Sequence, residues 1–316
     1  MSIDGRGVDR RQILALGVGL AASAWAGSCR ALAEAQSGTG ALITRPIPHS
    51  GETLPVIGLG TSEVFDIGDD AAQRRACADV VRRLIAGGGT VIDTAPSYGR
   101  AEAVVGDLLD ETGLRGRAFL ATKLEDFDRA IGPGELRASL QRLRTNKVEV
   151  MQLHNVSDPK QDLAMLREWQ AQGLCRYVGI TTSYRGAFDA VEAVLRREKP
   201  DFLQVNYSLG DRDAEQRVLP AAAEVGAAVL VDLPLARGRL FRAVRGRPLP
   251  DWAREIDAAS WAQFFLKYIL GNSVITAVIP GTNNPEHMAD DLGAGRGRLP
   301  DDAERRKMVA FFESLG

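Results

Sequence analysis

Cysteine is scarce in this chain, with three residues in 316 positions. Cys29 lies near the N-terminus, and Cys77 and Cys175 stand alone, without the close spacing that zinc ligands require. We therefore expect no metal site, and we expect Cys77 and Cys175 to be buried free thiols and not a disulfide pair.

Positive charge is not in excess either, since the formal net charge is −2 and the isoelectric point is near 6.0. The sequence has no basic stripe with interleaved aromatic residues, which argues against a nucleic-acid partner. No G-x-G-x-x-G run follows any expected strand, so the fingerprint of a doubly wound dinucleotide-binding domain is missing as well. With 45% hydrophobic and 25% charged residues, the chain has the composition of an ordinary soluble globular protein.

Residues 1–40 have the pattern of a targeting segment, a signal peptide followed by a linker. Arg10 and Arg11 precede an Ala/Gly-rich apolar run, 13–26, that is too short to span a bilayer. The paired arginines resemble a twin-arginine export signal, and an A-x-A cleavage site ends at Ala33. Two alternatives stay open, a poor lipobox ending at Cys29 and an apolar N-terminus without export.

Export by the twin-arginine route would carry the chain across the membrane already folded. We therefore expect the twin-arginine machinery as a partner and a periplasmic or otherwise exported location. We expect no stable membrane insertion of the mature chain. An enzyme exported in this way could load a cofactor in the cytoplasm, keep it bound, and recycle it between two substrates.

The remaining residues, 41–316, are predicted to form a single α/β domain. A β-hairpin is expected from 42–47 and 54–57, which flank a turn containing Pro48 and Gly51. Short β-branched runs then alternate with segments of helical periodicity, and no linker interrupts them. This alternation predicts a (β/α)8 TIM barrel with an extra C-terminal helix. The expected strands are 56–61, 91–93, 119–122, 148–153, 177–181, 202–206, 227–231 and 274–279.

Polar side chains stand at the ends of three consecutive expected strands. Asp93 ends the second strand and Tyr98 follows five residues later, Lys123 comes after the third strand, and His154 after the fourth. Each residue alone has an ordinary explanation, as a turn cap, a solvated lysine or a half-buried histidine. Because chemistry in such a barrel sits at the C-terminal ends of the strands, we expect the four side chains to converge.

The four groups together suit the reduction of a carbonyl. The Lys123 ammonium would lower the pKa of Tyr98, and the Asp93 carboxylate would hold the lysine in place. A neutral His154 could hydrogen-bond a carbonyl oxygen and orient it. The tyrosine could then protonate the alkoxide that forms as a hydride reaches the carbonyl carbon. Only the hydride donor is missing from this set.

These strand ends and several later motifs resemble the aldo-keto reductase family. The resemblance spans roughly 54–292 and implies a (β/α)8 barrel that binds NADPH in an extended form without a Rossmann domain. It implies an NAD(P)H-dependent oxidoreductase in which Tyr98 is the general acid, Lys123 and Asp93 tune it, and His154 orients a small aldehyde or ketone. The motifs are Gly58-Leu59-Gly60-Thr61, Asp93 to Gly99, Ala121-Thr122-Lys123, Gln152-Leu153-His154, 179–182, 204–208, 234–238 and 279–282.

The resemblance also implies cofactor contacts, which group by the part of the cofactor that they would bind. Thr61 and Asp93 match positions near the nicotinamide ribose; Thr181, Thr182 and Gln204 match positions at the carboxamide; Pro234, Leu235 and Arg237 match the pyrophosphate loop; and Gly281, Thr282, Asn283, His287 and Asp291 match the adenosine end.

Two of these regions depart from the family pattern. Asp232 stands where many members stack an aromatic ring on the nicotinamide, which a carboxyl group cannot do. Gly281 and His287 stand where members selective for the 2′-phosphate carry a lysine and an arginine, so two fixed cations are absent from those positions. NADPH is the family expectation, and NADH or dual use stays open.

Other readings of the same barrel remain. Some relatives, the potassium-channel beta subunits, use it as a cofactor-binding regulatory module with slow chemistry, and a non-redox lyase or isomerase would need a metal or phosphate site. Substrate selectivity is expected in the loops after strands one, four and seven. The candidate pocket residues there are Val64, Phe65, Asp66 and Trp252, whereas Trp261 is expected in a helix core.

Overall fold

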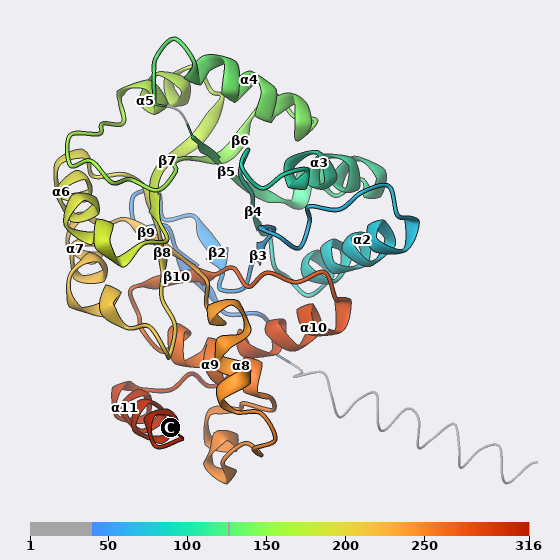
Figure 1. The fold of residues 1–316 in the computed structure, drawn as a ribbon, viewed down its shortest axis with the longest axis vertical. Coiled ribbons are helices and arrows are strands. Elements are labelled where there is room, and N and C mark those ends of the chain that lie inside the picture. Colours follow the sequence, from blue (N-terminus) through green and yellow to red (C-terminus); the bar gives the residue numbers. More distant parts are fainter. Residues whose placement is uncertain (1–39, 126, 316) are drawn as a thin grey trace, which may run out of the picture. The chain divides into compact units, whose positions relative to one another are not determined.

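Eight parallel strands alternate with helices around a nearly closed barrel in the computed structural model, which describes residues 40–125 and 127–315 (Figure 1). The strands lie side by side in chain order, from β3 to β10, as the TIM-barrel prediction requires. Their bounds are β3 Leu59–Gly60, β4 Val91–Asp93, β5 Phe119–Leu124, β6 Val148–Leu153, β7 Cys175–Thr182, β8 Phe202–Asn206, β9 Ala228–Asp232 and β10 Ile275–Val278. The predicted leader lies outside the described residues.

Helices form the outer ring of the barrel (Figure 1). Their apolar residues repeat with the helical period, as the sequence predicts for the segments between the strands. The helices are α2 Ala71–Ala86, α3 Ala101–Thr112, α4 Gly132–Arg142, α5 Ala164–Ala171, α6 Phe188–Glu198, α7 Val218–Val225, α8 Arg239–Ala243, α9 Trp261–Leu270, α10 Pro285–Ala294 and α11 Asp302–Glu313.

The connection from β9 to α9 contains three short helical pieces. They are the 3-10 turn η4 (Ala236–Gly238), the helix α8 and the 3-10 turn η5 (Asp251–Ile256). Leu240, Ala253 and Ile256 are buried, so α8 and η5 are each fixed by packing. Pieces this short do not show a helical period in the sequence.

The predicted hairpin is present and covers the N-terminal end of the barrel. Strand β1 (Thr44–Pro46) pairs antiparallel with β2 (Thr53–Pro55), and Ile47 and Leu54 join the apolar cluster at the starts of the barrel strands. The Arg45 guanidinium donates to the main-chain oxygens of Leu270 (2.5 Å) and Asn272 (2.9 Å). Because the hairpin fills the N-terminal end of the barrel, a substrate can enter only at the C-terminal ends of the strands.

The barrel closes between its first and last strands with few hydrogen bonds. Only single bridges, Ile57 to Val278 and Gly60 to Gly281, join the β3 and β10 regions across the seam within the described residues. A Cβ on Gly60 would lie 2.8 Å from the main-chain oxygen of Ile279, so the seam needs a glycine at this close approach.

Cys77 and Cys175 are buried free thiols, as predicted. None of the helices in the described part of the chain is long and apolar enough to cross a membrane. Within residues 40–125 and 127–315, no group of three or more His, Cys, Asp and Glu side chains is arranged to hold a metal ion.

Candidate active site

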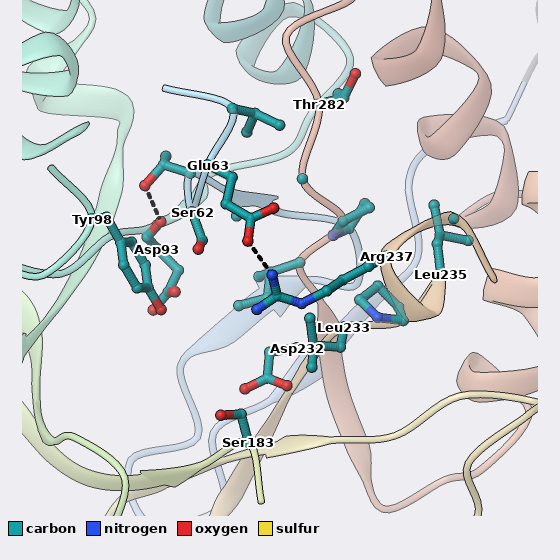
Figure 2. Close-up of a pocket in the computed structure, with 18 of the residues that line it drawn as sticks. Ser62, Glu63, Asp93, Tyr98, Ser183, Asp232, Leu233, Leu235, Arg237 and Thr282 are labelled. Atoms are coloured by element: carbon teal, nitrogen blue, oxygen red, sulfur yellow. Dashed lines mark hydrogen bonds and ion pairs between the residues drawn. The ribbon is translucent and has the colours of Figure 1, made fainter. Parts of the chain in front are cut away.

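A cavity of about 1020 Å³ opens at the C-terminal ends of the strands. The residues around it come from the strands themselves and from the segments that follow β3, β4, β6, β7, β9 and β10 (Figure 2). All four predicted catalytic residues line it: Asp93, Tyr98, Lys123 and His154.

Lys123 and Asp93 form a buried ion pair at the base of the cavity. Lys123 Nζ lies 2.8 Å from Asp93 Oδ2 and 2.9 Å from the main-chain oxygen of Thr94, and each of the paired side chains is less than 5% exposed. Burial acts to lower the pKa of Lys123, but the Asp93 charge outweighs it and the pKa is raised above its usual value. The lysine is therefore a permanent cation beside the cavity.

Tyr98 lies against this cation. Lys123 Nζ is 4.9 Å from the centroid of the Tyr98 ring. Burial raises the pKa of Tyr98 and the Lys123 charge lowers it, and the net direction is upward. The sequence prediction of a lowered Tyr98 pKa is therefore wrong in its net direction, although Lys123 acts with the expected sign. A phenol that keeps its proton is suited to act as an acid.

His154 is held by a carboxylate that the sequence analysis missed. The His154 ring packs edge-on against Tyr98, with centroids 6.0 Å apart, and its Nδ1 lies 2.6 Å from Glu125 Oε2. The other Glu125 oxygen accepts a hydrogen bond of 2.6 Å from Ser97 Oγ. Burial raises the pKa of Glu125, but the hydrogen bonds from His154 and Ser97 outweigh it and leave the pKa below its usual value.

This arrangement changes the role expected of His154. An ionised Glu125 can only accept a hydrogen bond from His154. The Nδ1 atom of His154 must therefore carry the proton of this hydrogen bond. In a neutral His154 the remaining nitrogen, Nε2, is then an acceptor and cannot donate to a carbonyl oxygen. Only the imidazolium offers an Nε2–H donor, so the predicted neutral orienting histidine does not fit the geometry.

Gln204 lines the cavity with an unused amide. Its side chain is 1% exposed, and neither Oε1 nor Nε2 has a hydrogen-bond partner in the part of the chain that the structure describes. Thr181 also lines the cavity, and its hydroxyl accepts a 2.9 Å hydrogen bond from the main-chain N–H of Asn155. An unpartnered buried amide beside a cavity matches a ligand group with one donor and one acceptor.

Thr182 was predicted to contact the cofactor, but it does not line the cavity. Its side chain is fully buried, and its hydroxyl accepts a 3.2 Å hydrogen bond from the main-chain N–H of Tyr184 in a local turn. Asn155, just after His154, reaches the cavity instead and was not predicted. Its Oδ1 accepts from the main-chain N–H of Ser183 at 3.1 Å, which fixes the amide plane.

The predicted pyrophosphate segment also lies at the cavity, where Pro234, Leu235 and Arg237 line it. The chain makes a tight excursion there, with positive φ at Leu233 (48°), Ala236 (49°) and Arg237 (51°). Arg237 forms an ion pair with Glu63, from the segment after β3, and the pair crosses the cavity in Figure 2.

Four of the five residues predicted at the adenosine end line the cavity: Gly281, Thr282, His287 and Asp291. The fifth, Asn283, is exposed and does not line it. Burial and, second, the Asp290 charge raise the pKa of Asp291 to about 8. The only Lys and Arg side chains that line the cavity in the described residues are Lys123 and Arg237, and both are paired.

Two predictions about the substrate pocket are wrong. Phe65 is fully buried in the core, although its neighbours Val64 and Asp66 line the cavity. Trp252 does not line the cavity, whereas Trp261 begins α9, packs against Phe265 as expected of a helix-core residue, and lines the cavity as well. Trp252 instead packs in an aromatic cluster, 5.5 Å from the ring of Phe264 and 5.7 Å from that of Phe311, between centroids.

A sequence model of the aldo/keto reductase family matches residues 56–306, which is most of the chain. The methylglyoxal reductase YeaE of Escherichia coli (strain K12) is 31% identical over 242 residues, covering 73% of this chain and 83% of that protein. An NADH-specific methylglyoxal reductase of the same strain is 25% identical over 327 residues, covering 85% of this chain and 98% of that protein.

Solved structures are similar as well. The crystal structure of an aldo-keto reductase from Klebsiella pneumoniae in complex with NADPH has a TM-score of 0.71 and 25% identity, covering 86% of this chain and 96% of that chain. A second structure from the same organism, in complex with NADP and acetate, has a TM-score of 0.68 and 26% identity, covering 87% and 95% of the respective chains.

Proposed function

Because the chain belongs to the aldo/keto reductase family, we propose that it reduces an aldehyde or ketone to an alcohol, with a nicotinamide cofactor as hydride source and Tyr98 as general acid. The observation that carries this proposal is the Tyr98 hydroxyl group, protonated and packed beside the buried Lys123–Asp93 pair. Since two relatives are methylglyoxal reductases, small 2-oxoaldehydes are the first substrates to test.

Proton transfer falls to Tyr98. When bound, the nicotinamide cofactor supplies the hydride that reduces the carbonyl carbon. Tyr98 gives its proton to the carbonyl oxygen as negative charge develops there, and the fixed Lys123 cation stabilises the phenolate that remains. Asp93 keeps Lys123 in place through its Oδ2 atom. The other oxygen of Asp93, Oδ1, accepts a hydrogen bond of 3.4 Å from Gln152 Nε2.

His154 positions the substrate in this proposal. As an imidazolium it donates Nδ1–H to Glu125 and presents Nε2–H to the carbonyl oxygen beside Tyr98. The two donors then meet on one oxygen, which fixes the carbonyl plane and increases the positive potential where charge develops.

The residues present fit a nicotinamide dinucleotide. The unpartnered amide of Gln204 matches the donor and acceptor of a carboxamide, with Thr181 and Asn155 beside it. Thr61 and Asp93 would hold the nicotinamide ribose, and Pro234, Leu235 and Arg237 the pyrophosphate. The adenosine end would be held by Gly281, Thr282, His287 and Asp291.

Tyr98→Phe tests the acid role directly. Removing the proton donor is expected to lower carbonyl reduction by about 10² to 10⁴-fold while cofactor affinity, followed by fluorescence, stays within about twofold. Tyr177→Phe is a matched control at a tyrosine that does not line the cavity, and its turnover should equal that of the wild type. Undiminished turnover in Tyr98→Phe would sink the mechanism.

A cofactor-binding regulatory module of the same fold is the alternative function. The complete set of Asp93, Tyr98, Lys123 and His154 in one cavity favours the enzyme. A screen of simple aldehydes and ketones with NADH and NADPH separates the two, because a regulatory module would bind cofactor with little turnover.

We also propose export of the folded chain through the twin-arginine machinery, on the strength of the residues 1–33 alone. Replacing Arg10 and Arg11 by lysine should leave the protein in the cytoplasm of a bacterial host, measured by fractionation. An unchanged distribution between the fractions would reject the proposal.

A further inference from the structure

One carboxyl group at the cavity has no part in the proton transfer described above. Asp232 ends β9, and its main chain pairs with Asn206 at the end of β8. Its Oδ1 is shielded from solvent and has no hydrogen-bond partner among the described residues. Figure 2 shows the carboxyl group among the residues that line the cavity, near Ser183 and Arg237.

The charged groups around Asp232 do not neutralise it. Lys123 is committed to Asp93 and Arg237 to Glu63, so the two nearby cations each hold another carboxylate. Burial and, second, repulsion from Asp93 raise the pKa of Asp232 to about 7, against the attraction of Lys123 and Arg237. The Asp232 charge also acts on Tyr98, where it helps to raise the phenol pKa. Asp232 therefore shares the electrostatic environment of the proton donor.

The reaction creates positive charge in this same region. A reduced nicotinamide ring is neutral and becomes a cation when it gives its hydride, as two electrons and one proton, to the carbonyl carbon, while Tyr98 provides the other proton. The reacting end of the cofactor must lie beside the carbonyl that Tyr98 protonates. A shielded carboxylate in that place attracts the oxidised ring and is indifferent to the reduced one.

We propose that the Asp232 carboxylate makes the oxidised cofactor bind more tightly relative to the reduced cofactor, which renders the bound cofactor a stronger hydride donor and retains it after the reaction. This inference rests on the proposed function, because it requires a nicotinamide cofactor. The cofactor phosphates are common to both redox forms, so their repulsion by Asp232 cancels in the comparison.

The effect depends on pH with a definite sign. Oxidised cofactor stabilises the ionised carboxyl group and so depresses the pKa of Asp232 below the value of about 7 in the free protein. The preference for oxidised cofactor is therefore fully present above pH 7 and is lost as the pH falls through the pKa of the complex. Asp93, Lys123, Arg237 and Tyr98 are the charged and titratable groups that modulate this value.

The test is the ratio of the two dissociation constants, Kd of the reduced cofactor over Kd of the oxidised cofactor, measured by fluorescence and calorimetry on the full chain. At pH 8, Asp232→Asn should lower this ratio at least about tenfold, and each factor of ten changes the potential of the bound two-electron couple by about 30 mV. Asp232→Glu should keep most of the wild-type ratio. Asp66→Asn, which removes an exposed carboxyl group at the same cavity, should change it less than about twofold.

The outcomes are distinct. If both redox forms bind and Asp232→Asn leaves the ratio unchanged at pH 8, this inference fails and the proposed function stands. If neither form binds the wild-type protein, the proposed function fails with it. If Asp232→Asn does not fold, the wild-type ratio decides alone: it must fall between pH 8 and pH 5.5, and a flat profile overturns the inference.

Discussion

Glu125→Gln is the sharpest perturbation that the site offers. The variant keeps the size of the side chain but replaces the anion that accepts the Nδ1–H of His154 at 2.6 Å with a neutral amide. A hydrogen bond between charged groups contributes about 1.5–3 kcal/mol, against about 0.5–1.5 kcal/mol for a neutral one. If the imidazolium orients the carbonyl, losing about 1–1.5 kcal/mol of this interaction should lower kcat/KM about 5- to 15-fold near neutral pH.

The pH profile separates this explanation from a general loss of structure. Because the pKa of Glu125 is held below its usual value, the wild-type enzyme should keep this counter-charge until the pH falls through that pKa, and the resulting loss of activity at low pH should be absent in Glu125→Gln. Ser97→Ala removes the other side-chain partner of Glu125 and leaves the charge, so its loss at neutral pH should be under about threefold, and the loss of activity at low pH should remain. A Glu125→Gln enzyme with wild-type kcat/KM and profile would refute the view that His154 acts as a cation.

Three further outcomes follow from charge and packing. Because both cations that line the cavity within residues 40–125 and 127–315 are paired, NADH should give a higher kcat/KM than NADPH, and His287→Arg should improve the value for NADPH at least about tenfold; a strong NADPH preference in the wild type would contradict this. Lys123→Met leaves Asp93 buried without its counter-charge and should lower the free energy of unfolding by about 3–5 kcal/mol in denaturant titration, with partial recovery when Asp93→Asn is added. In Gly106→Ala the new Cβ would lie 2.2 Å from a main-chain oxygen at the end of α4, which should cost about 1–3 kcal/mol; Gly116→Ala, in open space, should be neutral within about 0.5 kcal/mol by the same assay.

Much of the barrel could be predicted because its signals are local. Helical periodicity showed that helices alternate with the strands, and short β-branched runs located the strands. Asp93, Lys123 and His154 were predictable as a group because parallel strands place their C-terminal ends at one face. The free thiol state of Cys77 and Cys175 followed from their spacing and burial tendency.

The rest depended on geometry that sequence patterns do not carry. Glu125 follows β5 and His154 follows β6, so their contact joins the ends of two different strands. The only sequence signal for Glu125 is its position two residues after Lys123. The net direction of the Tyr98 pKa depends on how deeply the ring is buried, which outweighs the charge that the sequence revealed. Trp252 lies in η5, a piece with no periodic signal, so its place outside the cavity could not be predicted.

The narrow seam between β3 and β10 has a consequence for local opening. Amide protons there, such as those of Gly58 and Gly60, are held by single bonds to Val278 and Pro280, whereas β6 and β7 share a long ladder. Hydrogen–deuterium exchange should therefore be faster at the seam than in the β6–β7 region. Gly60 and Gly281, which form one of the bridges, also line the cavity. A ligand that contacts both β3 and β10 would then hold the two edge strands together. Slower hydrogen–deuterium exchange at the seam would therefore report ligand binding without any turnover.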